Sequence, residues 1–246
     1  MKILLKASYD GKNYCGWQVQ KNGQSIQGEL CRAAKEVYGT DVKVTGCSRT
    51  DSGVHALEYC FTLETPQNAP EIPLDKLPIA LNIKLNEDIS VFYAEAAADG
   101  FHARYSVKGK TYEYRIDNGV YRSPFKVGYA WHLKKPLDEK IMDTAAKEFI
   151  GKHDFSAFMA SGSDITDTVR TVTDAEVLRS GDEVIFRVSA DGFLYNMVRI
   201  MVGTLTEISY GKIRPDEIRD IILSGDRKRA GITAPPDGLY LKNVEY

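Results

Sequence analysis

The chain has 246 residues and carries 32 Lys and Arg against 34 Asp and Glu, a formal net charge of −2. At roughly 150 residues per domain, this length predicts one or two domains with a substantial core. A composition that is 43% hydrophobic and 27% charged excludes a disordered chain, and the near-neutral balance excludes binding to nucleic acid by bulk charge alone. No apolar run reaches the ~18 residues of a membrane-spanning helix. The first six residues are too short for a signal-peptide core, so we expect a cytoplasmic protein with no membrane partner.

The cysteines and histidines do not follow the spacing of a zinc site. No Cys-x-x-Cys pair is present and the four histidines are scattered. In a cytoplasmic protein the cysteines are expected to be reduced thiols, and no metal is expected. The four cysteines are Cys15, Cys31, Cys47 and Cys60.

The first half of the chain is predicted to run strand, helix, strand, strand. Ser25 is a good first cap for a helix with a regular apolar stripe, and Gly39 is a good terminator. The segment 65–78 holds four prolines and predicts a loop with at most a short helix. The predicted strands are 2–9, 42–47 and 57–63.

The second half is predicted to repeat this order. Ser180-Gly181-Asp182 lies between two alternating segments and predicts a hairpin turn. Pro215 suits the first position of a last helix, and a turn at Pro235-Pro236 leads into a terminal strand. The other predicted elements are strands at 110–116, 169–178 and 183–190, and helices at 137–149 and 197–208.

This alternation of strands and helices, with hairpins among them, indicates an α+β fold. It favours a largely antiparallel sheet over a doubly wound parallel one. The similar order of the two halves suggests duplication of one unit. We expect an N-terminal half over 1–100 and a C-terminal half over 101–246.

The charges are distributed unevenly along the chain. Residues 64–99 contain seven acids against two lysines, a net charge of −5, whereas residues 101–135 contain eight bases against two acids, a net charge of +6. The basic segment also contains eight aromatic residues. Basic side chains bind phosphates, and aromatic rings stack on unpaired nucleobases. A strand-rich segment with a buried aromatic face and a solvated basic face would give the same pattern, so both interpretations stay open.

The most unusual segment is Ser-Arg-Thr-Asp-Ser-Gly-Val-His-Ala at 48–56, between two predicted strands. Loops held by rigid strands commonly carry function, although Asp-Ser-Gly is also good turn chemistry. Asp-Ser-Gly is the tripeptide of aspartic proteases too, but those enzymes need a second carboxylate and the chain has no second copy. Arg49, two residues before Asp51, favours a fully ionised carboxylate instead.

Two further segments could carry chemistry. Arg199 interrupts an apolar run and would share one helix face with Asn196, Gly203 and Thr206. This face could be a solvated polar stripe, or it could direct the arginine towards a carboxylate. Gly203 would let another backbone come close to this helix. In the strand at 109–115, Tyr112 and Tyr114 would share one face and Glu113 the other. Tyrosines in such a strand are more often core than ligand contacts.

Together these segments resemble the TruA-type tRNA pseudouridine synthases. The matching segments follow the order of that family and cover essentially the whole chain. They are 8–11, 16–20, 48–56, 99–104, 110–114, 153–155, 193–203 and 234–241.

The resemblance implies an isomerase that converts uridine to pseudouridine in the anticodon stem-loop of tRNA, typically at nucleotides 38, 39 and 40. It implies no metal and no organic cofactor. It also implies a homodimer that holds tRNA across both subunits. The implied fold has two ferredoxin-like halves that form a shared, mainly antiparallel sheet with helices packed on one face.

The resemblance also implies roles for three catalytic residues. Asp51 matches the catalytic aspartate, whose attack requires the ionised form. Arg199 matches the arginine that pairs with this carboxylate, and Tyr112 matches the tyrosine that stacks on the target base. The Tyr112 hydroxyl could also transfer protons. Whether the aspartate attacks the base or the sugar stays open, and so does which uridines and RNAs are modified.

Substrate contacts are implied elsewhere. Arg49 matches the arginine that displaces the target nucleotide and takes its place in the stem, and His102 and Arg104 lie in a matching segment expected to contact RNA. Ser48 and Ser52 depart from the family pattern, which most often has Gly and Ala there, and Ser48 could not adopt a glycine-only backbone angle without strain. A non-catalytic RNA-binding protein on the same scaffold would also explain the basic aromatic segment.

Overall fold

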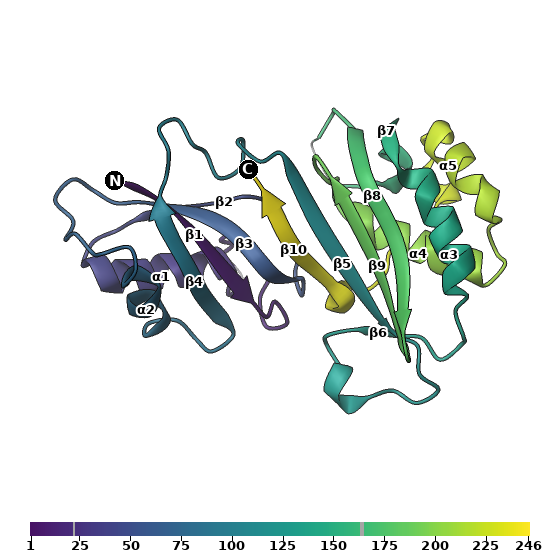
Figure 1. Cartoon of the computed structure of the whole chain (residues 1–246), viewed down its shortest axis with the longest axis horizontal. Helices are drawn as coiled ribbons and strands as arrows, with labels where there is room; N and C mark the ends of the chain where they lie inside the picture. Colours follow the sequence, from purple (N-terminus) through teal and green to yellow (C-terminus); the bar gives the residue numbers. More distant parts are fainter. Residues whose placement is uncertain (22, 163–164) are drawn as a thin grey trace. The chain divides into compact units, whose positions relative to one another are not determined.

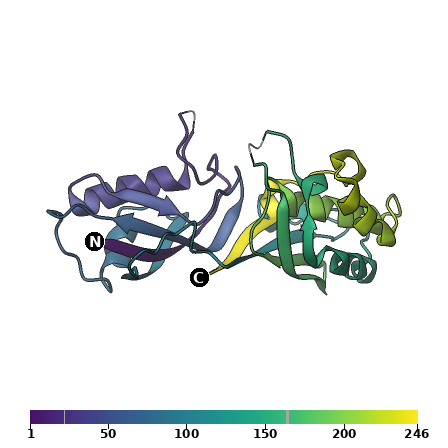
Figure 2. The same cartoon turned by 90° about the horizontal axis from the view of Figure 1, so that it is seen from above.

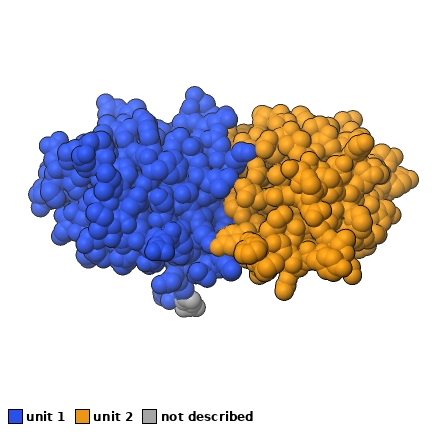
Figure 3. All heavy atoms as spheres, turned by 60° about the horizontal axis from the view of Figure 1, so that its bottom comes forward, with its two compact units in different colours: residues 1–108, 241–246 blue, residues 109–240 orange. Residues whose placement is uncertain are grey.

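The computed structural model describes residues 1–21, 23–162 and 165–246, which form α-helices and mainly antiparallel strands (Figure 1). The chain divides into two compact units, coloured separately in Figure 3. Unit 1 comprises residues 1–108 and 241–246, and unit 2 comprises residues 109–240. The last strand, β10 (Leu239–Glu245), begins in unit 2 and ends in unit 1.

Unit 1 is built around its first strand. β1 pairs antiparallel with β3 on one side and with β4 on the other, and β2 and β10 both lie along β3. In chain order the unit runs strand, helix, strand, strand, helix, strand. Its elements are β1 (Lys2–Tyr9), α1 (Ile26–Tyr38), β2 (Lys43–Gly46), β3 (His55–Glu64), α2 (Leu77–Asn82) and β4 (Ile89–Ala96).

Helix α1 begins and ends where its sequence predicts. The Ser25 hydroxyl accepts a hydrogen bond from the backbone N–H of Gly28 at 3.2 Å, and Gly39 ends the helix with a left-handed φ of 69°. The helix lies along one face of the unit 1 strands (Figure 2), and its apolar stripe is buried there. The buried residues are Ile26, Leu30, Ala33, Ala34 and Tyr38.

In chain order, unit 2 runs two strands, a helix, three strands and two helices. Its strands lie in the order β5, β9, β8, β7, all antiparallel, with the short β6 parallel beside β5. The β8–β9 hairpin turns at Ser180–Glu183, as predicted. The elements are β5 (Gly109–Asp117), β6 (Trp131–His132), α3 (Glu139–Ala146), β7 (Gly151–Asp154), β8 (Val169–Ser180), β9 (Glu183–Ala190), α4 (Met197–Ser209) and α5 (Ile218–Ser224).

The predicted α+β class with mainly antiparallel strands is confirmed. One interpretation of α4 is wrong: its polar face is not a solvated stripe, because Gly203 and Thr206 are buried. The Thr206 hydroxyl donates to the Gly203 carbonyl at 2.8 Å, which satisfies it inside the core. None of the described helices combines the length and apolar character needed to cross a membrane.

Candidate active site

The loop between β2 and β3 carries Asp51, and its backbone is fixed by the residues around it. The Thr50 hydroxyl lies 2.9 Å from the Tyr9 hydroxyl in the core, and the Thr50 carbonyl accepts a hydrogen bond from the Trp17 N–H at 3.1 Å. Gly16, with a φ of 104°, passes so close that a Cβ there would lie 2.5 Å from the Thr50 oxygen. The position before Asp51 is therefore held from two sides.

Asp51 itself opens a tight turn. Its carbonyl accepts from the Val54 N–H at 3.2 Å, and Gly53 takes a left-handed φ of 79°. The Gly53 N–H and the Ser52 hydroxyl both donate to the Tyr14 carbonyl, at 3.3 and 3.2 Å. The turn interpretation of this segment is thus correct, and the same turn presents a half-buried carboxylate on a rigid backbone.

The start of the loop rests on an aromatic support that the sequence did not indicate. The Tyr59 hydroxyl donates to the Ser48 carbonyl, and the Tyr59 ring stacks on Trp17 with centroids 4.1 Å apart. Gly46 lies against both rings and has no room for a side chain. Among the described residues only Asn196 combines a side chain with positive φ, so Ser48 and Ser52 fit the loop without glycine angles.

His55 ties the loop to the end of β1. Its buried Nδ1 lies 3.1 Å from the Gly11 N–H and 3.0 Å from Asp10 Oδ1. Gly11 packs directly on the Val54 carbonyl, where any side chain would overlap it. These contacts pack the Asp10-Gly11 segment against the Asp51 loop, so the two segments support each other.

Tyr14 links the loop to the start of β4 and has a perturbed pKa. Its hydroxyl donates to Asp88 Oδ1 at 2.6 Å, while its carbonyl accepts from the loop. Burial, reinforced by the hydrogen bond to the Asp88 carboxylate, raises the pKa of Tyr14 to about 12 from an ordinary 10.0.

This shift predicts an alkaline loss of stability. Because the folded pKa lies above the unfolded one, the contribution of Tyr14 is complete below pH 10 and declines as the pH rises towards 12. We expect Tyr14→Phe to cost ~1 kcal/mol of unfolding free energy at pH 7. The variant should also lose stability less steeply than the wild type in urea titrations between pH 9.5 and 11.5. Tyr121→Phe, at an exposed hydroxyl, is the control, and equal slopes in wild type and Tyr14→Phe would contradict the assignment.

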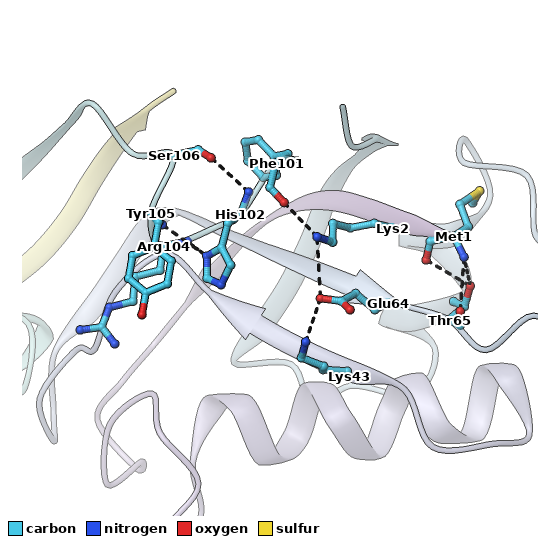
Figure 4. Close-up of polar contacts among 10 residues, drawn as sticks. All are labelled: Met1, Lys2, Lys43, Glu64, Thr65, Phe101, His102, Arg104, Tyr105 and Ser106. Atoms are coloured by element: carbon cyan, nitrogen blue, oxygen red, sulfur yellow. Dashed lines mark hydrogen bonds and ion pairs between the residues drawn. The ribbon is translucent and has the colours of Figure 1, made fainter. Parts of the chain in front are cut away.

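The segment with His102 and Arg104 forms a compact loop in unit 1 (Figure 4). His102 Nδ1 accepts from the backbone N–H groups of Arg104 and Tyr105, at 3.1 and 3.3 Å. Acceptance at Nδ1 places the proton of the neutral ring on Nε2, which leaves Nε2–H as a donor. Tyr105 is 76% exposed, with its ring 4.4 Å from the His102 ring and 5.8 Å from the Arg104 guanidinium.

This loop is anchored to the N-terminal strand. Lys2 Nζ donates to the Phe101 carbonyl at 2.9 Å and lies 4.0 Å from Glu64, which also pairs with Lys43 at 3.1 Å (Figure 4). The anchors leave Arg104 exposed at the surface.

In unit 2, Tyr112 and Tyr114 share the predicted face of β5. Tyr114 is fully buried and donates to the Pro235 carbonyl at 2.7 Å, and burial raises its pKa strongly. Tyr112 lies nearer the surface, with its ring edge-on to Phe193 at 5.1 Å. Tyr114 is thus a core residue, as the structural interpretation expects, whereas Tyr112 keeps slight exposure.

Arg199 is oriented by two hydrogen bonds within unit 2. Its Nε donates to the Ala234 carbonyl at 2.7 Å and its Nη1 donates to Asn196 Oδ1 at 2.6 Å. Asn196 precedes α4 in a left-handed conformation with a φ of 60°, which asparagine tolerates better than most residues. The Ala234 N–H donates back to the Arg199 carbonyl at 3.1 Å. The planar guanidinium is therefore fixed from both sides.

Two glycines allow the segment 231–234, whose Ala234 carbonyl binds the Arg199 side chain, to lie close to α4. A side chain at Gly203 would overlap the Ile232 carbonyl, and a Cβ at Gly231 would lie 2.6 Å from Thr204 Cα. The Thr204 hydroxyl accepts from the Gly231 N–H at 2.9 Å. The predicted close approach at Gly203 is confirmed, and it brings the Ala234 carbonyl to the arginine.

The predicted site residues thus fall into three groups. Arg49 and Asp51 share the β2–β3 loop, His102 and Arg104 share a second loop of unit 1, and the other two belong to unit 2. The latter are Tyr112 and Arg199. Across the described parts of the chain, no three His, Cys, Asp or Glu residues gather in a way that could hold a metal ion.

Comparison with known proteins identifies the family. The family model described as tRNA pseudouridine synthase matches residues 6–106 and 145–246. The tRNA pseudouridine synthase A of Thermoanaerobacter sp. (strain X514) is 49% identical over 244 residues, 99% of this chain and 99% of the relative. The tRNA pseudouridine synthase A 2 of Clostridium perfringens (strain 13 / Type A) is 46% identical over 244 residues, with the same coverage.

The chain therefore belongs to the tRNA pseudouridine synthase family, whose members isomerise uridine to pseudouridine in tRNA. This finding overturns the aspartic protease alternative. Among solved structures, a chain of a Cbf5-Nop10-Gar1 complex is 14% identical with a TM-score of 0.34, over 82% of this chain and 53% of that one. That similarity is too low to bear on the fold.

Proposed function

We propose that this protein converts uridine to pseudouridine in the anticodon stem-loop of tRNA, at nucleotides 38, 39 and 40. The observation that carries the proposal is the Asp51 turn, whose backbone is bonded to Trp17 and Tyr14 and whose neighbour Thr50 is anchored in the core. A carboxylate that acts as nucleophile must keep its orientation while a base is cut from its sugar and rejoined. A turn fixed in this way provides that orientation.

The reaction needs a nucleophile and a way to move protons. The N1–C1′ bond of the target uridine breaks, the base turns, and a C5–C1′ bond forms. C5 then loses its proton and N1 gains one, so the product is an isomer of the substrate. We assign the ionised Asp51 as the nucleophile, Tyr112 as the ring that stacks on the target base, and Arg199 as the cation for the catalytic carboxylate.

The remaining predicted residues suit contacts with RNA. Arg49 is exposed and has no partner among the described residues, so its planar guanidinium is available to fill the place of an extruded base. His102 offers its Nε2–H and Arg104 its exposed guanidinium to phosphate or base oxygens. We further propose that the protein acts as a homodimer, which sedimentation equilibrium would test: a monomer at micromolar concentration would contradict it.

Release of tritium from tRNA labelled at C5 of uridine tests the activity. Purified wild-type protein should release tritium from an unmodified tRNA transcript, because C5 loses its hydrogen when it joins C1′. Replacing the uridines at 38–40 with cytidine should abolish the release. Undiminished release would refute the target positions, and tRNA binding without any release would support the non-catalytic RNA-binding alternative.

A further inference from the structure

The loop 118–130 after β5, which we call the aromatic loop, displays large apolar side chains in solvent. Phe125 is 91% exposed and Tyr121 is 88% exposed, with Val120 and Val127 also exposed beside them. Figure 1 shows the loop, with its short helical turn, extending beyond the end of β5 near β6. An exposed apolar group of this kind usually marks a binding surface.

The aromatic loop is held in a defined conformation from within unit 2. The buried Asp117 carboxylate accepts from the Ser123 N–H and from Lys126 Nζ, both at 3.3 Å. The Tyr129 carbonyl accepts from the Tyr240 hydroxyl at 2.8 Å, and the Gly119 carbonyl lies 3.0 Å from His132 Nε2. The two exposed rings therefore project from a fixed backbone.

The loop and the residues directly after it are rich in basic side chains. Residues 118–135 contain four bases and no acid. Lys126 pairs with Asp117 and Glu183, whereas Arg122 and Lys134 have no partner in the described part of the chain. A cavity of about 190 Å³ opens beside the loop, and its lining includes Arg122, Lys126 and Trp131 together with the acids Asp117 and Asp237.

We propose that the aromatic loop is an RNA-contact surface in which Phe125 and Tyr121 stack on unpaired nucleobases and Arg122 binds phosphate. The inference rests on the proposed function for its RNA, a tRNA, and assigns the loop to unpaired nucleotides of that substrate. Aromatic rings stack on any nucleobase, and the unpartnered basic side chains nearby complement the phosphates. The other candidate occupant is a second copy of the chain. In a two-fold contact its Arg122 and Lys134 would face the same side chains of the first copy and repel them, so the unpaired cations favour a polyanion.

Substitutions at Phe125 separate stacking from hydrophobic burial. We expect Phe125→Ala and Phe125→Leu to weaken tRNA binding about tenfold, because both remove the ring, and Phe125→Trp to retain it. Leu223→Ala, at a 78% exposed apolar residue on α5, is the matched control and should bind like the wild type. Binding is measured by fluorescence anisotropy with labelled, unmodified tRNA at fixed salt.

Two further measurements keep the outcome decisive. Arg122→Ala should reduce the slope of log Kd against log salt by about one, as expected for one lost phosphate contact. Sedimentation velocity of the Phe125 variants should match the wild type. Unchanged tRNA affinity in Phe125→Ala would overturn the proposal. The proposal would also be overturned if Phe125→Ala changed the oligomeric state while Phe125→Leu bound tRNA like the wild type. Because binding does not require turnover, failure of tritium release by the wild type would refute the proposed function and leave this test intact.

Discussion

The Asp51→Asn variant is expected to fold and bind tRNA like the wild type and to form pseudouridine at least on the order of 10³-fold more slowly. Asparagine has the size of aspartate but no charge, so it cannot act as the nucleophile. The turn's hydrogen bonds described above come from backbone groups and the Ser52 hydroxyl, and the substitution changes none of these groups. Tritium release under single-turnover conditions measures the loss.

Two neighbouring variants show whether the loss is specific. Ser52→Ala removes the hydroxyl bond to the Tyr14 carbonyl and should keep activity within about tenfold of the wild type. Asp51→Glu keeps the charge but lengthens the side chain on a backbone that is fixed, and should be nearly inactive. Rates for Asp51→Asn within tenfold of the wild type would remove Asp51 from the chemistry.

Gly203→Ala is expected to destabilise unit 2 strongly. The added Cβ would overlap the Ile232 carbonyl, so either α4 or the segment that follows α5 must shift. We expect a loss of about 3 kcal/mol in unfolding free energy and a fall in Tm of roughly 10 °C. Because the same segment carries the Ala234 carbonyl that binds Arg199, pseudouridine formation should fall as well.

Gly192→Ala is the control for this prediction. A Cβ at Gly192 would meet only the flexible side chain of Arg170, at 3.2 Å, and its φ lies outside the left-handed range. We expect its unfolding free energy to stay within ~1 kcal/mol of the wild type. A Gly203→Ala protein as stable as Gly192→Ala in urea unfolding would contradict the close approach between α4 and Ile232.

Elements with strong local signals were predictable from the sequence. Helix α1 has a capping serine, a regular apolar stripe and a terminal glycine, and it begins and ends as expected. Strand β4 was missed because only Ile89 and Val91 are buried in it, so its alternation is weak. The last helix was placed at Pro215, but a 3₁₀ turn occupies 215–217 and α5 begins at Ile218.

The candidate site shows the same limit. The motif at 48–56 could be recognised, and so could the close approach that Gly203 permits. The groups that hold these parts in place could not, because they act through space. Tyr59 supports Ser48 from eleven residues away. The sequence placed Asn196 on the same face as Arg199, but not its left-handed conformation before α4 or its hydrogen bond to the guanidinium. The Tyr59 contact has no local sequence signal, and the backbone conformation of Asn196 has only a weak one.

Net charge shows why composition was a poor guide to the partner. The total of −2 suggests no affinity for a polyanion, yet residues 118–135 hold four bases without an acid. Arg122 and the exposed Phe125 lie in that stretch. Binding to RNA through such a local surface should weaken as salt rises.

Nucleotide-resolution mapping of pseudouridine tests the central claim most directly. An unmodified tRNA transcript with uridines at 38–40 is incubated with purified wild-type protein or with Asp51→Asn, and pseudouridine is located by chemical labelling and primer extension. We predict pseudouridine at those positions with the wild type and none with the variant. Pseudouridine elsewhere in the tRNA, none with the wild type, or an equal yield with Asp51→Asn would contradict this account.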